Sequence, residues 1–101
     1  MTSKQRAYLK GLAMTMEDVL QIGKSGVSEE VTRSVEEAIR ARELIKIHVL
    51  QNCLYDIREM AQVLADEVGA EVVQVIGRKI VLYKENRKNP QIVLPKAGRR
   101  G

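Results

Sequence analysis

The sequence predicts one α/β domain in which the elements follow the order α-β-α-β-α-β-β around a four-stranded mixed sheet. Three observations support this prediction. The chain has 101 residues, 45% of them hydrophobic, which suits a single domain. Three segments with helical spacing of apolar residues alternate with short runs rich in branched side chains. The last two runs are separated by only two residues, as in a hairpin.

The first helix is predicted over residues 3–14. Thr2 and Gln5 have the spacing of a capping box, and the apolar residues that follow recur at helical intervals. Arg6 and Lys10 stand four positions apart and therefore share one side of this helix. They could contact phosphates there or only face water.

A glycine-bracketed loop follows the short strand predicted at 19–22. We call it the GKSG loop, and its residues are Gly23, Lys24, Ser25 and Gly26. Because glycine has no Cβ, both ends of the loop can take positive φ and admit a bulky partner. Lys24 adds a cation, and a helix capped by Ser28 would direct N–H groups toward the loop. The loop suits a phosphate backbone, although a Gly-x-x-Gly turn is also common as a structural feature.

The second helix begins after Ser28 and has one apolar side. Its polar side starts with two glutamates, which compete with any bound phosphate, and ends at Glu43. The strand predicted at 44–50 alternates, which places Lys46 and His48 on one face. We interpret His48 as a surface histidine, because the chain offers neither a second histidine nor an evident nucleophile.

The third helix is predicted to begin at Asp56, which caps it, and to end at Gly69. Residues 71–76 and 79–84 then predict a hairpin around Gly77 and Arg78, from whose tip Arg78 and Lys79 should project. Because strand-helix-strand crossovers are right-handed, the second and third helices should lie on one face of the sheet.

After the hairpin the composition becomes polar. We expect this segment to dock through Ile92, Val93 and Leu94. The predicted domain covers residues 1–96, and residues 97–101 are predicted to be a disordered basic tail.

Composition argues against several classes of function. The single cysteine, Cys53, and the single histidine offer no disulfide and no zinc cluster. Val27 stands where a nucleotide-hydrolysing loop needs a lysine, and no nucleophile-base pair is evident. No apolar run approaches the roughly 18 residues of a membrane span. We therefore expect a soluble cytoplasmic protein, without cofactor or metal, that is not an enzyme.

The charge is distributed unevenly. The net charge is +4, but residues 77–101 alone carry eight basic side chains against one acidic one. Clustered cations raise the local potential that a polyanion experiences. With three tyrosines and no phenylalanine or tryptophan, the chain has no aromatic array for stacking bases.

Four segments of the chain form a recognisable set, at residues 3–10, 20–27, 43–47 and 74–84. Together they resemble the CRM domain, named for chloroplast RNA splicing and ribosome maturation, in its stand-alone bacterial form, the YhbY family. The resemblance covers about residues 2–95 and implies a fold similar to the C-terminal domain of translation initiation factor three. It further implies non-catalytic RNA binding through a GxxG loop, and association with precursors of the large ribosomal subunit.

The resemblance carries over to individual residues of this sequence. Gly23, Lys24 and Gly26 match the family's loop, and Lys46 and the basic pair at 78–79 are plausible neighbours. Ser25 departs from the pattern, because many relatives have a second basic or amide residue there. Since Ser25 offers only a hydroxyl group, the resemblance implies a weaker loop in this chain.

We therefore predict a monomeric RNA-binding ribosome assembly factor whose partner is ribosomal RNA in large-subunit precursors. The candidate RNA-binding residues are Gly23, Lys24, Ser25, Gly26, Arg6, Lys10, Lys46, Arg78 and Lys79. The alternative is a protein-interaction module that binds basic ribosomal proteins through the acidic second helix.

Overall fold

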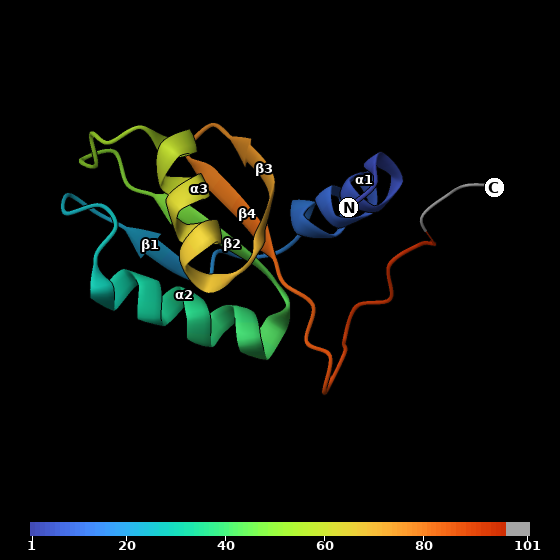
Figure 1. The fold of residues 1–101 in the computed structure, drawn as a ribbon. Helices are drawn as coiled ribbons and strands as arrows, with labels where there is room; N and C mark the ends of the chain where they lie inside the picture. Colours follow the sequence, from blue (N-terminus) through green and yellow to red (C-terminus); the bar gives the residue numbers. More distant parts are fainter. Residues whose placement is uncertain (97–101) are drawn as a thin grey trace.

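The computed structural model describes residues 1–96, and in them the helices and strands follow the predicted order. The elements are α1 (Ser3–Met14), β1 (Leu20–Ile22), α2 (Glu29–Arg42), β2 (Leu44–Val49), α3 (Ile57–Val68), β3 (Glu71–Ile76) and β4 (Lys79–Tyr83) (Figure 1). The predicted fold class is confirmed. The predicted tail at 97–101 lies outside the described residues.

The four strands form one mixed sheet in the order β1-β2-β4-β3. β1 and β2 are parallel and are joined by α2, whereas the β2–β4 and β3–β4 pairs are antiparallel. The hairpin between β3 and β4 closes at the pair Ile76 and Lys79, and Gly77 takes positive φ (57°) at its first turn position. The predicted hairpin is therefore confirmed.

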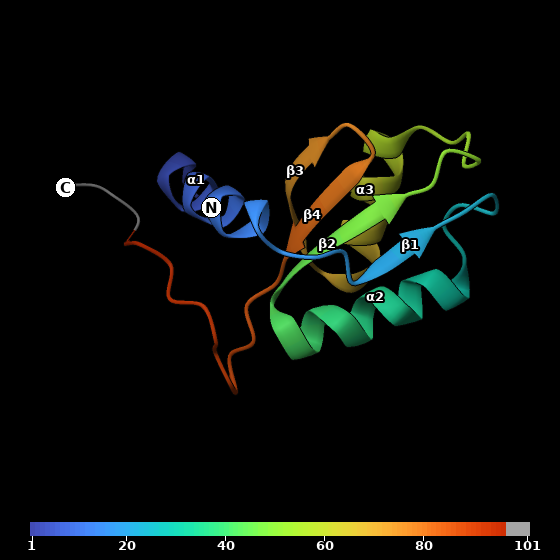
Figure 2. The same cartoon turned by 180° about the vertical axis from the view of Figure 1, so that it is seen from behind.

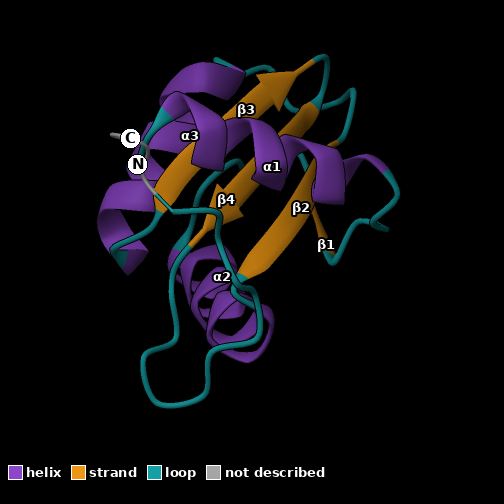
Figure 3. Cartoon of the chain, turned by 90° about the vertical axis from the view of Figure 1, so that its right-hand side faces the viewer, coloured by secondary structure: helices purple, strands orange, loops and turns teal. Residues whose placement is uncertain are grey.

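The two faces of the sheet carry separate hydrophobic clusters. Ile45, Ile47 and Val49 of β2 point to the face that α2 and α3 cover, as predicted. Leu9 and Ala13 of α1 pack on the opposite face, in a smaller cluster with residues such as Leu44, Val81 and Tyr83. Figure 3 shows this arrangement, with α1 in front of the sheet and α2 and α3 behind it.

The helix ends are fixed by the predicted caps. Thr2 and Gln5 form a reciprocal capping box at α1. The Ser28 hydroxyl accepts from the N–H of Val31 at α2, and the Asp56 carboxylate accepts from the N–H of Glu59 at α3. None of the described helices combines the length and the apolar character needed to cross a membrane.

The end of α2 differs from the sequence-based expectation. Glu43, predicted on the polar side of the helix, is fully buried and takes positive φ (67°). Its carboxylate accepts hydrogen bonds from the backbone N–H groups of Asn86, Gln91 and Ile92, at 2.7, 2.8 and 2.7 Å. A single side chain therefore fastens the C-terminal segment to the body of the domain.

The C-terminal segment docks, but not through all three predicted residues. Ile92 and Leu94 pack against the α1 cluster, whereas Val93 is exposed. The side-chain amide of Gln5 also donates to the carbonyl of Pro95 at 3.0 Å. In an extended segment neighbouring side chains alternate in direction, which is why Val93 faces away from the domain.

Candidate nucleic-acid interface

The GKSG loop lies at the end of the sheet where the parallel strands β1 and β2 both finish. The N–H of Leu50 donates to the carbonyl of Ile22 at 2.8 Å, so the chain after β2 starts beside the chain after β1. Figures 1 and 2 both show the GKSG loop next to the connection between β2 and α3, which we call the 50–56 loop. The candidate interface therefore consists of two adjacent loops.

The GKSG loop is a tight turn that depends on one of its two glycines. The N–H of Gly26 donates to the carbonyl of Gly23 at 3.0 Å, and Gly26 takes positive φ (68°). A Cβ at Gly26 would stand 2.6 Å from Cδ2 of Tyr55, so only glycine fits beneath that ring. Gly23 does not take positive φ, and a Cβ there would meet only ordinary contacts, the nearest at 3.8 Å. Gly23 therefore does not use the positive φ that a glycine permits.

The middle of the loop faces solvent. Lys24 and Ser25 are exposed, and Ser28 caps α2 immediately after the turn. The exposed Glu29 and Glu30 follow in the first turn of α2, as the sequence predicted. An anion at this turn therefore meets the Lys24 ammonium group first and the two carboxylates beyond it.

The prediction that Arg78 projects from the hairpin tip is wrong. Its guanidinium group donates to the carbonyls of Val49, Leu50 and Cys53, at 2.9, 2.7 and 2.9 Å. A guanidinium fork presents several donors in a fixed geometry, so it can hold several carbonyls at once. Arg78 therefore fixes the first half of the 50–56 loop beside the GKSG loop.

Lys79 and Lys46 lie on the face of the sheet that α1 only partly covers. The Lys79 ammonium group is 2.6 Å from the Asp18 carboxylate, and His48 stands 3.9 Å from the same carboxylate. Lys79 is therefore paired within the protein, which differs from the prediction of a free charge at the tip. Lys46 is half-buried and pairs in register with Val81 of β4.

Arg6 and Lys10 are not brought to the GKSG loop, because α1 lies at the opposite end of the molecule (Figures 1 and 2). Arg6 donates to the carbonyls of Val72 and Val73, where the register of β3 shifts at a bulge. A bulge leaves a residue outside the regular ladder. Arg6 therefore stabilises an irregular strand within the protein.

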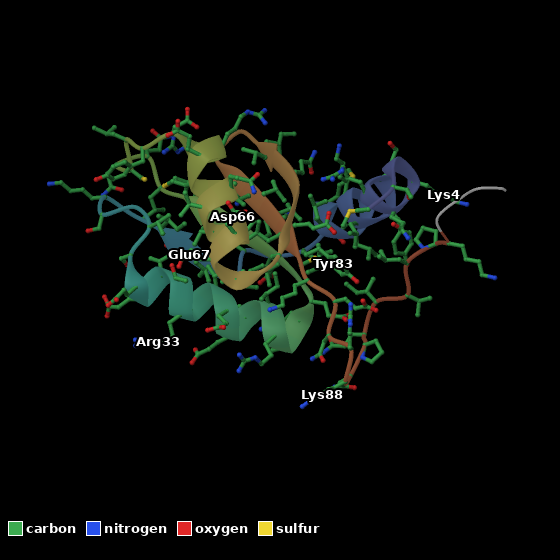
Figure 4. All side chains as sticks on the ribbon, viewed as in Figure 1. Lys4, Arg33, Asp66, Glu67, Tyr83 and Lys88 are labelled. Atoms are coloured by element: carbon green, nitrogen blue, oxygen red, sulfur yellow. The ribbon has the colours of Figure 1, made fainter. Side chains whose placement is uncertain are left out.

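Several other basic side chains of residues 1–96 also lie away from the GKSG loop. Figure 4 places Lys88 at the bend of the C-terminal segment, Arg33 beneath α2 and Lys4 beside α1. Lys84 donates to the carbonyl of Val68 at 2.8 Å. The positive charges of the residues named here are thus distributed around the fold.

Sequence reasoning missed two residues of the 50–56 loop. Leu54 is 92% exposed and Tyr55 is 60% exposed, and the Tyr55 ring lies against Gly26. Two neighbouring large apolar side chains in a polar connection were the available signal. Their closeness to the GKSG loop depends on the fold and could not be inferred from spacing.

Residues 1–96 contain no group of three histidine, cysteine or acidic side chains suited to a metal ion. Cys53 is buried, with its sulfur 3.8 Å from that of Met60, as expected for a small core residue.

The family model of the CRS1/YhbY (CRM) domain matches residues 1–84, which include both loops and the hairpin. The chain belongs to the CRS1/YhbY (CRM) domain family. The predicted family is thereby confirmed, and this CRM chain can be compared with individual relatives.

Two relatives and one solved structure match this CRM chain over nearly its whole length. It is 43% identical over 95 residues to the probable RNA-binding protein YqeI of Bacillus subtilis, covering 94% of this chain and 99% of that protein. It is 32% identical over 96 residues to an RNA-binding protein of Haemophilus influenzae, covering 95% and 96%. The solution structure of the protein SAV1595 from Staphylococcus aureus matches with a TM-score of 0.80 and 43% identity, covering 94% of this chain and 99% of that one.

Proposed function

We propose that this CRM-domain protein binds RNA without catalysis and that its GKSG loop holds the sugar-phosphate backbone. The observation that carries the proposal is the exposed Lys24 on a turn that the rest of the fold keeps rigid. Gly26 is fixed beneath Tyr55, Ser28 caps the following helix, and Arg78 holds the neighbouring loop. A preformed cationic turn loses little conformational freedom when it binds a phosphate.

We further propose that the RNA is ribosomal RNA in precursors of the large subunit, which would make the protein a ribosome assembly factor. The relatives named above as RNA-binding proteins support RNA as the partner. Structured RNA presents its phosphates in fixed positions, and sequence-tolerant contacts to them suit a protein with few aromatic residues.

The test is a filter-binding titration of large-subunit ribosomal RNA with Lys24→Glu. Charge reversal on the exposed turn should weaken binding at least about tenfold, since it replaces an attraction by a repulsion. Lys88→Glu is the matched control, because it changes the net charge equally at the distant bend of the C-terminal segment (Figure 4). Equal affinities of the two variants would contradict the role of the loop.

A second candidate function is binding of basic ribosomal proteins through α2. It is favoured by the exposed glutamates at 29, 30, 36 and 37, although Glu36 pairs with Arg40 at 3.7 Å. Co-purification of ribosomal proteins that survives nuclease treatment, and that is lost when Glu30 and Glu37 are replaced by glutamine, would favour this candidate over RNA.

A further inference from the structure

The 50–56 loop exposes an apolar surface beside the proposed phosphate-binding turn. The large side chains of Leu54 and Tyr55 are exposed to solvent, and Tyr55 contacts Gly26 of the GKSG loop. Arg78 fixes the preceding backbone through three carbonyls. The Tyr55 ring is therefore held by a fixed backbone and faces solvent beside the loop that carries Lys24.

A hollow of about 280 Å³ adjoins this ring. Val27, Met60 and Val63 give it an apolar lining, Tyr55 and Ser25 border it on the loop side, and Asp56 and Glu59 add two carboxylates. A phosphate group would be repelled by these carboxylates and would gain nothing from the apolar lining. A flat ring that carries a hydrogen-bond donor would suit the hollow better. Its face could lie on the Tyr55 ring and the apolar lining, and its donor could bind a carboxylate.

We propose that Tyr55 and this hollow take an unpaired nucleobase with an exocyclic amino group from the RNA strand whose backbone crosses the GKSG loop. The inference rests on the proposed function. Tyrosine offers a face on which any base can stack, and a glutamate can accept a hydrogen bond from an amino group such as N4 of cytosine. The Asp56 carboxylate caps α3 by accepting from the N–H of Glu59. We assign the base to the Glu59 carboxylate, which is not tied to the helix end.

The proposal changes the expected kind of recognition. The small number of aromatic residues argued against base contacts, but one exposed ring at the right place can hold one base. The GKSG loop would position the strand, and the hollow would discriminate among unpaired bases at a single position. Single-stranded segments of ribosomal RNA expose such bases, whereas paired helices do not.

A tryptophan reporter tests the stacking step directly, because the chain has no tryptophan of its own. Tyr55→Trp is titrated with a cytidine oligomer, a uridine oligomer and an abasic ribose-phosphate oligomer of equal length, and binding is followed independently by anisotropy. We expect the cytidine oligomer to quench the emission of the introduced indole and the abasic oligomer to leave it unchanged. Tyr8→Trp, on exposed α1, is the matched control and should respond to none of them.

Affinity measurements on three further variants separate stacking from loop support. Tyr55→Phe should retain affinity for the cytidine oligomer, whereas Tyr55→Ser should lose roughly five- to a hundredfold, the range for one stacked base. Tyr55→Ser should bind the abasic oligomer as well as the parent protein does. Glu59→Ala should reduce the preference for cytidine over uridine.

Two results would overturn the inference. If Tyr55→Ser loses affinity for the abasic oligomer as much as for the cytidine oligomer, the ring only supports the loop. If RNA binds to Tyr55→Trp while the indole emission stays unchanged, the inference fails and the proposed function stands. If neither the oligomers nor ribosomal RNA binds, the proposed function fails and the inference fails with it.

Discussion

Two chain reversals at opposite ends of α2 both require a positive φ but are stabilised in different ways. Gly26, before the helix, has φ of 68°, and Glu43, after it, has φ of 67°. A residue with a Cβ is disfavoured by about 1 to 3 kcal/mol at such a φ, whereas glycine loses almost nothing. Glu43 is retained there because its buried carboxylate binds three backbone N–H groups.

The comparison separates a closed end of the molecule from an open one. At Glu43 the polar groups of the C-terminal segment are satisfied within the protein. At the GKSG loop the turn is rigid, yet Lys24, Ser25 and Tyr55 remain turned to solvent. This difference is why we propose the exposed end as the binding surface.

The largest effect should follow loss of the Glu43 carboxylate. Glu43→Ala leaves three backbone donors without their acceptor and should lower the free energy of unfolding by about 3 kcal/mol. Glu43→Gly loses the same hydrogen bonds but relieves the positive φ, so it should be about 1 kcal/mol more stable than Glu43→Ala. Urea unfolding measures both differences. A Glu43→Ala protein as stable as the parent would contradict the claim that the Glu43 carboxylate holds the C-terminal segment.

Acid should weaken the same clasp. Burial raises the pKa of Glu43, but the N–H groups of Asn86, Gln91 and Ile92 outweigh it, so the pKa lies below its ordinary value. A lowered folded-state pKa gives stability that is complete above the unfolded-state value, about 4.3, and that is lost as the pH falls through the folded-state value. The stability difference between the parent and Glu43→Ala should therefore shrink in acid. A difference that stays constant with pH would argue against an ionised carboxylate.

At the open end the two loop glycines should respond differently. Gly26→Ala takes a strained φ and collides with Tyr55, so it should cost about 1 to 2 kcal/mol and displace the ring. Gly23→Ala meets only ordinary contacts and should leave stability within about 0.5 kcal/mol of the parent. Thermal unfolding distinguishes them, and equal losses would mean that Tyr55 does not depend on Gly26.

Arg78 should act on the open end through the 50–56 loop. Arg78→Lys keeps the charge but cannot hold three carbonyls, so it should cost about 1 kcal/mol and speed amide hydrogen exchange in that loop. Because the substitution does not change the net charge, any effect on RNA binding cannot come from a lost positive charge. Unchanged exchange together with weakened RNA binding would instead indicate that Arg78 contacts RNA directly.

The sequence predicted what depends on local chemistry. The capping residues, the hairpin glycine and the GKSG turn were all evident from neighbouring residues. The roles of Arg78, Glu43 and Tyr55 were not evident, because their partners are distant in the chain. Arg78 binds carbonyls at least 25 positions away, Glu43 binds N–H groups at least 43 positions away, and Tyr55 contacts Gly26, 29 positions away. A charged residue at a turn or a helix end looks exposed until the fold shows which backbone groups surround it.

The salt dependence of RNA binding tests the central claim most directly. Each phosphate contact that is lost should reduce the slope of log K against log salt by about 0.7 to 0.9. We predict that reduction for Lys24→Gln and an unchanged slope for Lys88→Gln, measured on the same ribosomal RNA. Equal slopes for the parent protein and Lys24→Gln would show that the GKSG loop does not hold the phosphate backbone.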